Sequence, residues 1–181
     1  MTDPSGGPDS VAPRRKGVWL LFAAVAVVWY AADQLTKHLA VAHLSDRQPR
    51  HFIGSLLQLQ LLRNPGAAFS MGTSATVVLS VLAIVATCVV LWFSRRLGDT
   101  VWAISLGLLL AGIVGNLTDR LLRAPSPLRG QVVDFLQLPH WPVFNIADVG
   151  INLGALLLLI QVLRGVAIDG RRGADGERAH G

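Results

Sequence analysis

Residues 100–118 read TVWAISLGLLLAGIVGNLT and contain no charged side chain. A helix needs about 20 mostly apolar residues to cross the hydrocarbon core of a bilayer, and this stretch meets that length. Three further charge-free stretches cover residues 17–32, 64–94 and 149–163. The sequence therefore predicts an all-α membrane protein with four transmembrane helices, at about residues 18–39, 74–93, 100–121 and 147–163.

The composition of the whole chain agrees with a membrane location. Of its 181 residues, 52% are hydrophobic and 15% are charged, whereas an average soluble domain has about 25% charged residues. The net charge is +5. Because no basic patch alternates with aromatic residues, we expect no nucleic-acid partner and attribute the charge to membrane orientation and anionic lipids. The single cysteine, Cys88, lies in an apolar run and is expected to be a small core residue.

Clusters of lysine and arginine predict the orientation, because basic residues beside short spans remain in the cytoplasm. The clusters lie before the first span, between the second and third, and after the fourth, at Arg14–Lys16, Arg95–Arg96 and Arg164–Arg172. With an even number of spans, all three clusters lie on one side of the membrane. We therefore expect both termini to be cytoplasmic.

One membrane domain, residues 17–164, is expected between two tails. The tails, residues 1–16 and 165–181, are expected to be disordered and cytoplasmic, because the first is rich in proline, glycine and serine and the second contains five glycines and scattered charge. Two longer connections, at about 40–73 and 122–146, are then extracytoplasmic.

The first of these connections contains a strand pattern. Leu57–Leu61 reads LQLQL, and such strict alternation is typical of a half-buried strand. Val132–Phe135 in the second connection is another candidate for extended chain. A strand needs partners, so we expect a small extracytoplasmic β-element resting on the outer face of the four helices.

Four carboxylates are expected at one depth, near the outer ends of the helices: Asp33, Asp119, Asp134 and Asp148. Carboxylates at that depth are costly and tend to face a bundle interior or a wet cavity. Asp33 has Lys37 four residues later, and Asp119 has Arg120 and Arg123 nearby, so a structural ion pair is favoured for both. The other two have no basic residue close in sequence and are the better candidates for chemistry.

Asparagine stands three residues before aspartate in two of these places, Asn116–Asp119 and Asn145–Asp148. Positions i and i+3 share a helix face, so the amide can hold the carboxylate by hydrogen bonding.

Two nearby carboxyl groups that share one proton can hydrolyse a peptide bond. The ionised group activates water, and the protonated group polarises the scissile carbonyl and then donates to the leaving amine. We expect Asp148 to be the ionised member, because it begins a helix. Asp134 is flanked by Val133 and Phe135, so desolvation should raise its pKa.

Other catalytic classes have weaker support. The serines lack a neighbouring base, and the histidines lack the spacing of metal ligands: Ser70, Ser74, Ser80 and Ser105; His38, His43, His51 and His140. We therefore expect no metal and no cofactor. Two further hypotheses stay open, a small proton-coupled transporter or channel subunit with membrane-embedded carboxylates, and a non-catalytic assembly protein that tolerates asparagine at the aspartates.

Five motifs carry a family resemblance: DQLTK at Asp33–Lys37, RNPGAAFS at Arg63–Ser70, GNLTDR at Gly115–Arg120, VVDF at Val132–Phe135 and FNIAD at Phe144–Asp148. In this order they resemble the bacterial lipoprotein signal peptidases (signal peptidase II), four-helix aspartic endopeptidases of the inner membrane. The resemblance implies Asp134 and Asp148 as the catalytic pair. It also implies that eight residues shape the site or hold substrate: Asp33, Lys37, Asn64, Gly66, Asn116, Asp119, Arg120 and Asn145.

The resemblance further implies a substrate and a location. The substrate would be a diacylglyceryl-modified prolipoprotein, cleaved just before the lipidated cysteine, and the enzyme would be a monomer in contact with membrane lipids. The active site would lie near the extracytoplasmic face of the bacterial cytoplasmic (inner) membrane. The segment Leu121–Gln131 looks longer than the link that the family usually has between its third and fourth motifs.

Overall fold

The computed structural model describes residues 12–44, 48–66 and 72–172. It contains four helices and three strands, in the order α1 (Ala12–His43), β1 (Arg50–Ile53), β2 (Leu57–Asn64), α2 (Gly72–Ser94), α3 (Thr100–Leu122), β3 (Val132–Gln137) and α4 (Ile146–Leu163). All four helices are long and apolar enough to cross a membrane. The prediction of a four-helix membrane protein with a small β-element is confirmed.

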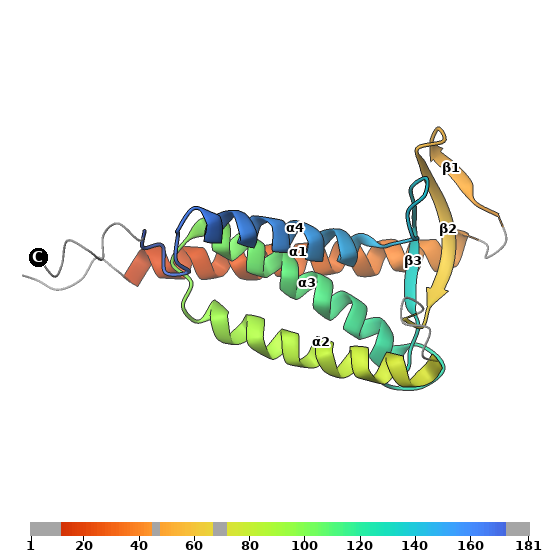
Figure 1. Cartoon of the computed structure of the whole chain (residues 1–181), viewed down its shortest axis with the longest axis horizontal. Helices are drawn as coiled ribbons and strands as arrows, with labels where there is room; N and C mark the ends of the chain where they lie inside the picture. Colours follow the sequence, from red (N-terminus) through yellow and green to blue (C-terminus); the bar gives the residue numbers. More distant parts are fainter. Residues whose placement is uncertain (1–11, 45–47, 67–71, 173–181) are drawn as a thin grey trace, which may run out of the picture.

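Helix α3 is the centre of the bundle and packs against α1, α2 and α4 (Figure 1). Its glycines allow this close packing. A Cβ added at Gly107 would meet the backbone and side chains of α1, and one added at Gly112 would meet Ala147 and Ile151 of α4. Small residues at helix interfaces let backbones approach closely in a membrane, where burial of apolar surface gives little driving force.

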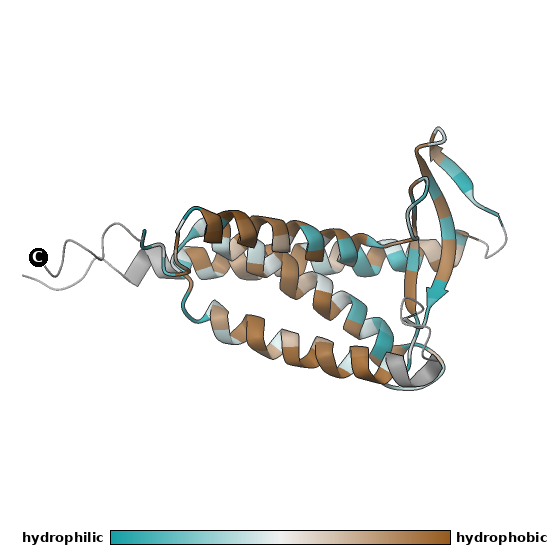
Figure 2. Cartoon of the chain, in the orientation of Figure 1, coloured by the Kyte–Doolittle hydropathy of each residue, from teal (hydrophilic) through white to brown (hydrophobic). Residues whose placement is uncertain are grey.

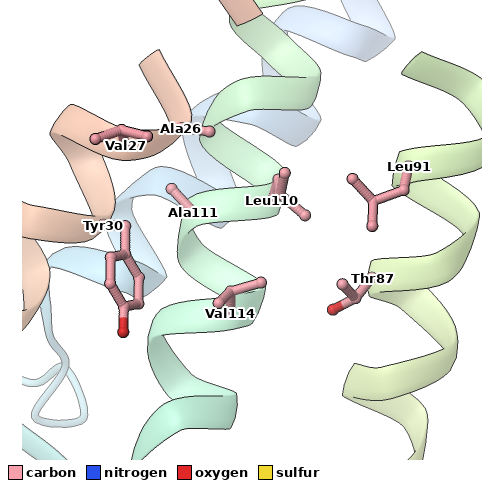
Figure 3. Close-up of a pocket in the computed structure, with 8 residues that line it drawn as sticks. All are labelled: Ala26, Val27, Tyr30, Thr87, Leu91, Leu110, Ala111 and Val114. Atoms are coloured by element: carbon pink, nitrogen blue, oxygen red, sulfur yellow. The ribbon is translucent and has the colours of Figure 1, made fainter. Parts of the chain in front are cut away.

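Helix α2 lies apart from α1 and α4 in the bundle (Figure 1). A pocket of about 270 Å³ opens between α1, α3 and α2. Figure 3 shows Tyr30 and Val27 of α1 on one side, Thr87 and Leu91 of α2 on the other, and α3 between them.

Hydrophobic residues cover most of the length of the helices (Figure 2). Many of them are exposed, such as Leu20, Val28 and Val85, because the bilayer is the solvent at this surface. Cys88 is exposed as well, so the expectation of a core residue is wrong. A helix that is apolar on all sides gives no sequence signal for which face is buried.

The three strands form an antiparallel sheet, ordered β1-β2-β3, across one end of the bundle (Figure 1). The predicted strand at Leu57 continues to Asn64, and β3 includes the second candidate segment. Strand β1 was not predicted, because all four of its residues are exposed and show no alternation. Residues Leu61, Val133 and Phe135 pack on Ala40 of α1 and thereby attach the sheet to the bundle.

The opposite end of the bundle gathers the start of α1, the α2–α3 turn and the end of α4 (Figure 1). The three basic clusters are in these segments, as the span count predicts. Helix α1 begins at Ala12, earlier than the expected start at residue 18, and continues to His43. Val166 forms a bridge with Arg172 after α4, so this part of the expected tail has defined structure. Residues 1–11 and 173–181 of the tails lie outside the described chain.

Candidate active site

A buried lysine lies where α1, α3 and the sheet meet. The Lys37 side chain is 0% exposed. Its Nζ atom lies 3.0 Å from Oδ2 of Asp33 and 2.9 Å from Oδ2 of Asp119. Asp119 also pairs with Arg123, one turn later on α3. The predicted ion pairs of both aspartates are thus confirmed, and two buried carboxylates are balanced by two cations.

The same two aspartates also tie separate elements together through their other oxygens. Oδ1 of Asp33 accepts a hydrogen bond from the backbone N–H of Ala147 at 2.8 Å, which fixes the start of α4 against α1. Oδ2 of Asp119 accepts from the backbone N–H of Val133 at 3.2 Å, which fixes β3 against α3. These contacts hold the two segments that carry Asp134 and Asp148.

Lys37 also orients the amide of Asn116. Oδ1 of Asn116 accepts from Lys37 Nζ at 2.9 Å and from Nδ2 of Asn145 at 3.1 Å. A lysine ammonium can only donate, so the oxygen of this amide must face Lys37. The amide nitrogen is then directed to Asp148, where it donates to Oδ1 at 2.8 Å.

Asp148 lies in the first turn of α4, where Asn145 is the N-cap. The Asn145 side chain accepts from the backbone N–H of Asp148 at 3.0 Å, and Oδ2 of Asp148 accepts from the backbone N–H of Asn145 at 3.1 Å. This reciprocal capping box satisfies two of the free backbone donors at the helix start. Its position favours a negatively charged carboxylate.

Asp134 lies in the middle of β3 and is 2% exposed. Its two oxygens accept hydrogen bonds from Asn145 Nδ2 at 2.6 Å and from Asn64 Nδ2 at 2.9 Å. The pKa of Asp134 is raised to about 6, chiefly by burial and also by the nearby charge of Asp148, while the Asn64 hydrogen bond acts in the opposite direction. The expected direction of this pKa shift is confirmed.

The two carboxyl groups are therefore linked by amides. Asn145 contacts both Asp134 and Asn116, and Asn116 contacts Asp148. Within the described chain, neither aspartate forms an ion pair with a lysine or arginine. Of the four aspartates in this region, Asp33 and Asp119 form ion pairs with described residues, while the hydrogen bonds to the other two carboxylates come from amide and backbone donors.

Asn64 is the last residue of β2, the central strand of the sheet, and begins the NPG turn. Oδ1 of Asn64 accepts from the backbone N–H of Gly66 at 2.8 Å. Gly66 has φ +97°, a conformation that side-chain-bearing residues rarely adopt. This turn aims the Asn64 amide at Asp134. The rest of the motif, residues 67–70, lies outside the described chain.

Arg120 is half-buried beside these groups. Its Nη1 atom donates to the backbone carbonyl of Asn116 at 3.4 Å, and its charge interacts with Asp148, Asp119 and Asp134. All ten residues singled out from the sequence are therefore in one connected region, contributed by three helices, two strands and the residues next to them, Gly66 and Asn145.

Some positioning contacts were not predicted. The Trp29 indole donates to the carbonyl of Ile146 at 2.9 Å, and Gln34 donates to Asp33 at 3.0 Å and to the carbonyl of Gly115 at 3.2 Å. Gln34 lies inside the first motif and could have been chosen on that ground, but Trp29 carries no local signal.

The alternative nucleophiles and metal ligands have other roles. Ser80 and Ser105 donate to backbone carbonyls, and the side chains of Ser70 and Ser74 lie outside the described part of the chain. The four histidines considered above are exposed. Among the described residues, no group of three or more histidine, cysteine, aspartate or glutamate side chains is arranged to hold a metal.

Comparison with known proteins gives a consistent result. The family model for signal peptidase (SPase) II matches residues 25–164. A lipoprotein signal peptidase from Rhodococcus jostii (strain RHA1) is 46% identical over 172 residues, which cover 94% of this chain and 85% of the relative. The lipoprotein signal peptidase of Mycobacterium tuberculosis (strain ATCC 25618 / H37Rv) is 47% identical over 174 residues, covering 95% and 85%.

A solved structure, described as that of a bacterial membrane enzyme, is similar over 79% of this chain and 92% of its own. The TM-score is 0.71 at 26% sequence identity. The region matched by the family model contains the second half of α1, the other three helices, the sheet and each residue of the candidate site. The chain therefore belongs to the signal peptidase II family and is a multi-pass membrane protease.

Proposed function

We propose that this protein is an aspartic endopeptidase that removes the signal peptide from diacylglyceryl-modified prolipoproteins. Cleavage occurs just before the lipidated cysteine. One observation carries the proposal. Asp134 and Asp148 reach a common set of amides from different elements, while the other two buried aspartates of the region are neutralised by Lys37 and Arg123.

In this proposal the two carboxyl groups hold one proton at rest. The raised pKa of Asp134 supports its being the protonated member. Asp148 lies in the first turn of α4, where the helix dipole favours a negative charge, and this supports its being the ionised member. Arg120 then balances the single negative charge of the pair. Four further charges, on Asp33, Asp119, Lys37 and Arg123, cancel among themselves.

Hydrolysis needs one water molecule and this one proton. Asp148 takes a proton from the water as its oxygen attacks the scissile carbonyl carbon, and the Asp134 hydroxyl donates a hydrogen bond to the carbonyl oxygen. As the C–N bond breaks, Asp134 gives its proton to the leaving amine. The products are a carboxylic acid and a free amine, and the pair again holds one proton, now on Asp148.

The position of the site suits a substrate that is itself a membrane helix. The pair lies where helix ends meet the sheet, so lipid can approach from the side of the bundle and water from the end (Figure 1). We assign this end to the extracytoplasmic side of the bacterial inner membrane, because the basic clusters are at the other end. We further propose that the enzyme works as a monomer.

A synthetic peptide with a signal helix and a diacylglyceryl cysteine tests the proposal. Incubation with the purified protein should yield two products, of which one begins at the lipidated cysteine, as measured by mass spectrometry. The same peptide without the lipid should be cleaved poorly. Cleavage at another bond, or equal cleavage of both peptides, would contradict the proposed substrate.

Asp134→Asn and Asp148→Asn should each lower turnover by about 10²–10⁴-fold or more, since each removes a proton-transfer group. Asp169→Asn is the matched control, because that aspartate pairs with Arg171 at the opposite end of the molecule. Undiminished cleavage by either site variant would remove that residue from the mechanism.

A further inference from the structure

A basic pocket lies beside the candidate active site and is not used by the proposed reaction. It has a volume of about 360 Å³ and is lined by Arg63 of β2 and by the segment after α3, with Arg123, Ala124, Pro125 and Gln131. No aspartate or glutamate is among these lining residues. Ala124 and Pro125 belong to the 121–131 segment, outside the five motifs.

The fold brings the two arginines together despite their like charge. Asp119 binds the Arg123 side chain through one oxygen and the Val133 backbone N–H through the other. Val133 is the register partner of Arg63 in the antiparallel β2–β3 pair. The same carboxylate therefore fixes both walls of the pocket.

Most guanidinium donors in the pocket have no partner among the described residues. Arg123 uses Nε for Asp119, and its remaining donors meet no acceptor within the described chain. The Arg63 side chain has no hydrogen bond or ion pair with any residue that the structure describes. Asp119 is already shared with Lys37 at 2.9 Å, so it cannot neutralise both arginines. Among the residues that the structure describes, the positive charge of the pocket is therefore not fully compensated.

The neighbouring residues indicate what kind of anion reaches this place. Arg123 directly follows the membrane span Thr100–Leu122. Leu122 is 80% exposed, which suits contact with lipid chains one residue below the arginine. Phosphate groups of lipids are concentrated at this depth, and the planar guanidinium matches their oxygens.

We propose that the pocket of Arg63, Arg123 and Gln131 binds the phosphate of a lipid headgroup at the membrane boundary next to the sheet. The two guanidinium groups hold the phosphate oxygens, the Gln131 amide adds a neutral donor, and the acyl chains lie along α3 at Leu122. The site anchors a membrane phospholipid a short distance from the catalytic pair.

Native mass spectrometry of the delipidated full chain in detergent tests this site. Dioleoyl phosphatidylglycerol should bind as one saturable molecule, whereas dioleoylglycerol, which has no phosphate, should not. Arg63→Gln should lower the affinity for the first bound phospholipid about tenfold, as expected for loss of one charged hydrogen-bonding group. Arg63→Lys keeps the charge but loses the planar guanidinium group. Its affinity for the phospholipid should lie between that of Arg63→Gln and that of the unaltered chain.

Arg129→Gln is the matched control, because Arg129 is exposed in the same segment and does not line the pocket. It should leave phospholipid binding unchanged. Equal binding of the phospholipid and the diacylglycerol, or equal loss in Arg63→Gln and Arg129→Gln, would overturn the proposal. Inorganic phosphate is a separate arm, and if it binds as tightly as the phospholipid, the ligand is a free anion and the lipid assignment is wrong.

Discussion

At the scale of single residues, the most informative side chain is a lysine without direct contact to either proposed catalytic aspartate. Lys37 is fully buried and touches Asp33, Asp119 and Asn116. It has two separable roles. It neutralises buried negative charge, and it decides which end of the Asn116 amide faces Asp148.

A pair of variants separates these two roles. Lys37→Met should lower stability strongly, because breaking a buried ion pair by removing one partner costs about 3–5 kcal/mol. The double variant Lys37→Met with Asp33→Asn restores charge balance, so its thermal midpoint in detergent should recover in large part. Peptidase activity should stay low, because the Asn116 amide is no longer held. Recovery of activity together with stability would show that Lys37 only balances charge.

The raised pKa of Asp134 predicts a pH dependence at the same scale. Asp134 acts as a proton donor, so kcat/KM should fall as the pH rises above about 6, where this group loses its proton in the free enzyme. The Asn64 hydrogen bond favours the ionised form. Asn64→Leu should therefore raise the pKa and move the alkaline limb of the profile to higher pH.

Asn152→Leu is the control for this measurement. Asn152 is exposed on α4 and donates to the backbone carbonyl of Asp148, so its loss should leave the alkaline limb in place. A limb that moves to lower pH in Asn64→Leu, or that moves equally in both variants, would contradict the role given to Asp134.

At the scale of helices and strands, the close contact between α3 and α4 sets the position of Asp148. Gly112 faces the carbonyl of Ala147 and the side chain of Ile151, and Ala147 directly precedes Asp148. A side chain at position 112 must push the start of α4 away from α3. The hydrogen bonds from Asn116 to Asp148 and from Asn145 to Asn116 would then lengthen.

Gly112→Ala should destabilise the bundle by about 1–3 kcal/mol, the usual cost of overpacking, and should lower peptidase activity as well. Thermal unfolding in detergent and the peptide cleavage assay measure the two effects. Gly17→Ala is the control, because no atom lies within 4 Å of the added Cβ. If both variants behave alike, the α3–α4 contact does not position the site.

The elements differ in how well they could be predicted. The spans follow from hydropathy and length alone. The bounds of α2, α3 and α4 agree with the predicted ones to within two residues, whereas α1 starts six residues earlier and ends four residues later than predicted. Strand β2 follows from its alternation. Strand β1 and the exposure of Cys88 could not be predicted, because an exposed edge strand and an evenly apolar helix carry no periodic signal.

The site shows the same limit. Asp33–Lys37 is a local i,i+4 pair and was predictable from spacing. The link from Lys37 through Asn116 to Asp148 joins residues far apart in sequence, so only the packing of α1, α3 and α4 reveals it. The motifs identify which residues belong to the site, and the packing identifies which atoms face each other.

At the scale of the whole molecule, charge and structure divide along the bundle axis. The sheet and the candidate site occupy one end, while the basic clusters at Arg95–Arg96 and Arg164–Arg172 occupy the other (Figure 1). By the positive-inside rule, we propose that the end with these clusters faces the cytoplasm. We infer that cleavage takes place at the extracytoplasmic boundary.

Reporter fusions at the C-terminus check this orientation. A fluorescent protein that matures only in the cytoplasm should fluoresce when fused there, and a periplasmic phosphatase should be inactive. The same two reporters inserted between β1 and β2, at Gly54, should give the opposite pattern. A fluorescent loop fusion would place the site on the cytoplasmic side and contradict the orientation.

The central claim is that Asp134 and Asp148 work as one catalytic unit, and a double-mutant cycle on kcat/KM for the lipidated peptide tests it most directly. When two groups act as one catalytic unit, replacing either one removes most of the effect of both, so the losses in kcat/KM are not additive. Asp134→Asn with Asp148→Asn should therefore be no slower than the slower single variant. Losses that multiply in the double variant would show that the two aspartates act independently and would contradict the shared-proton mechanism.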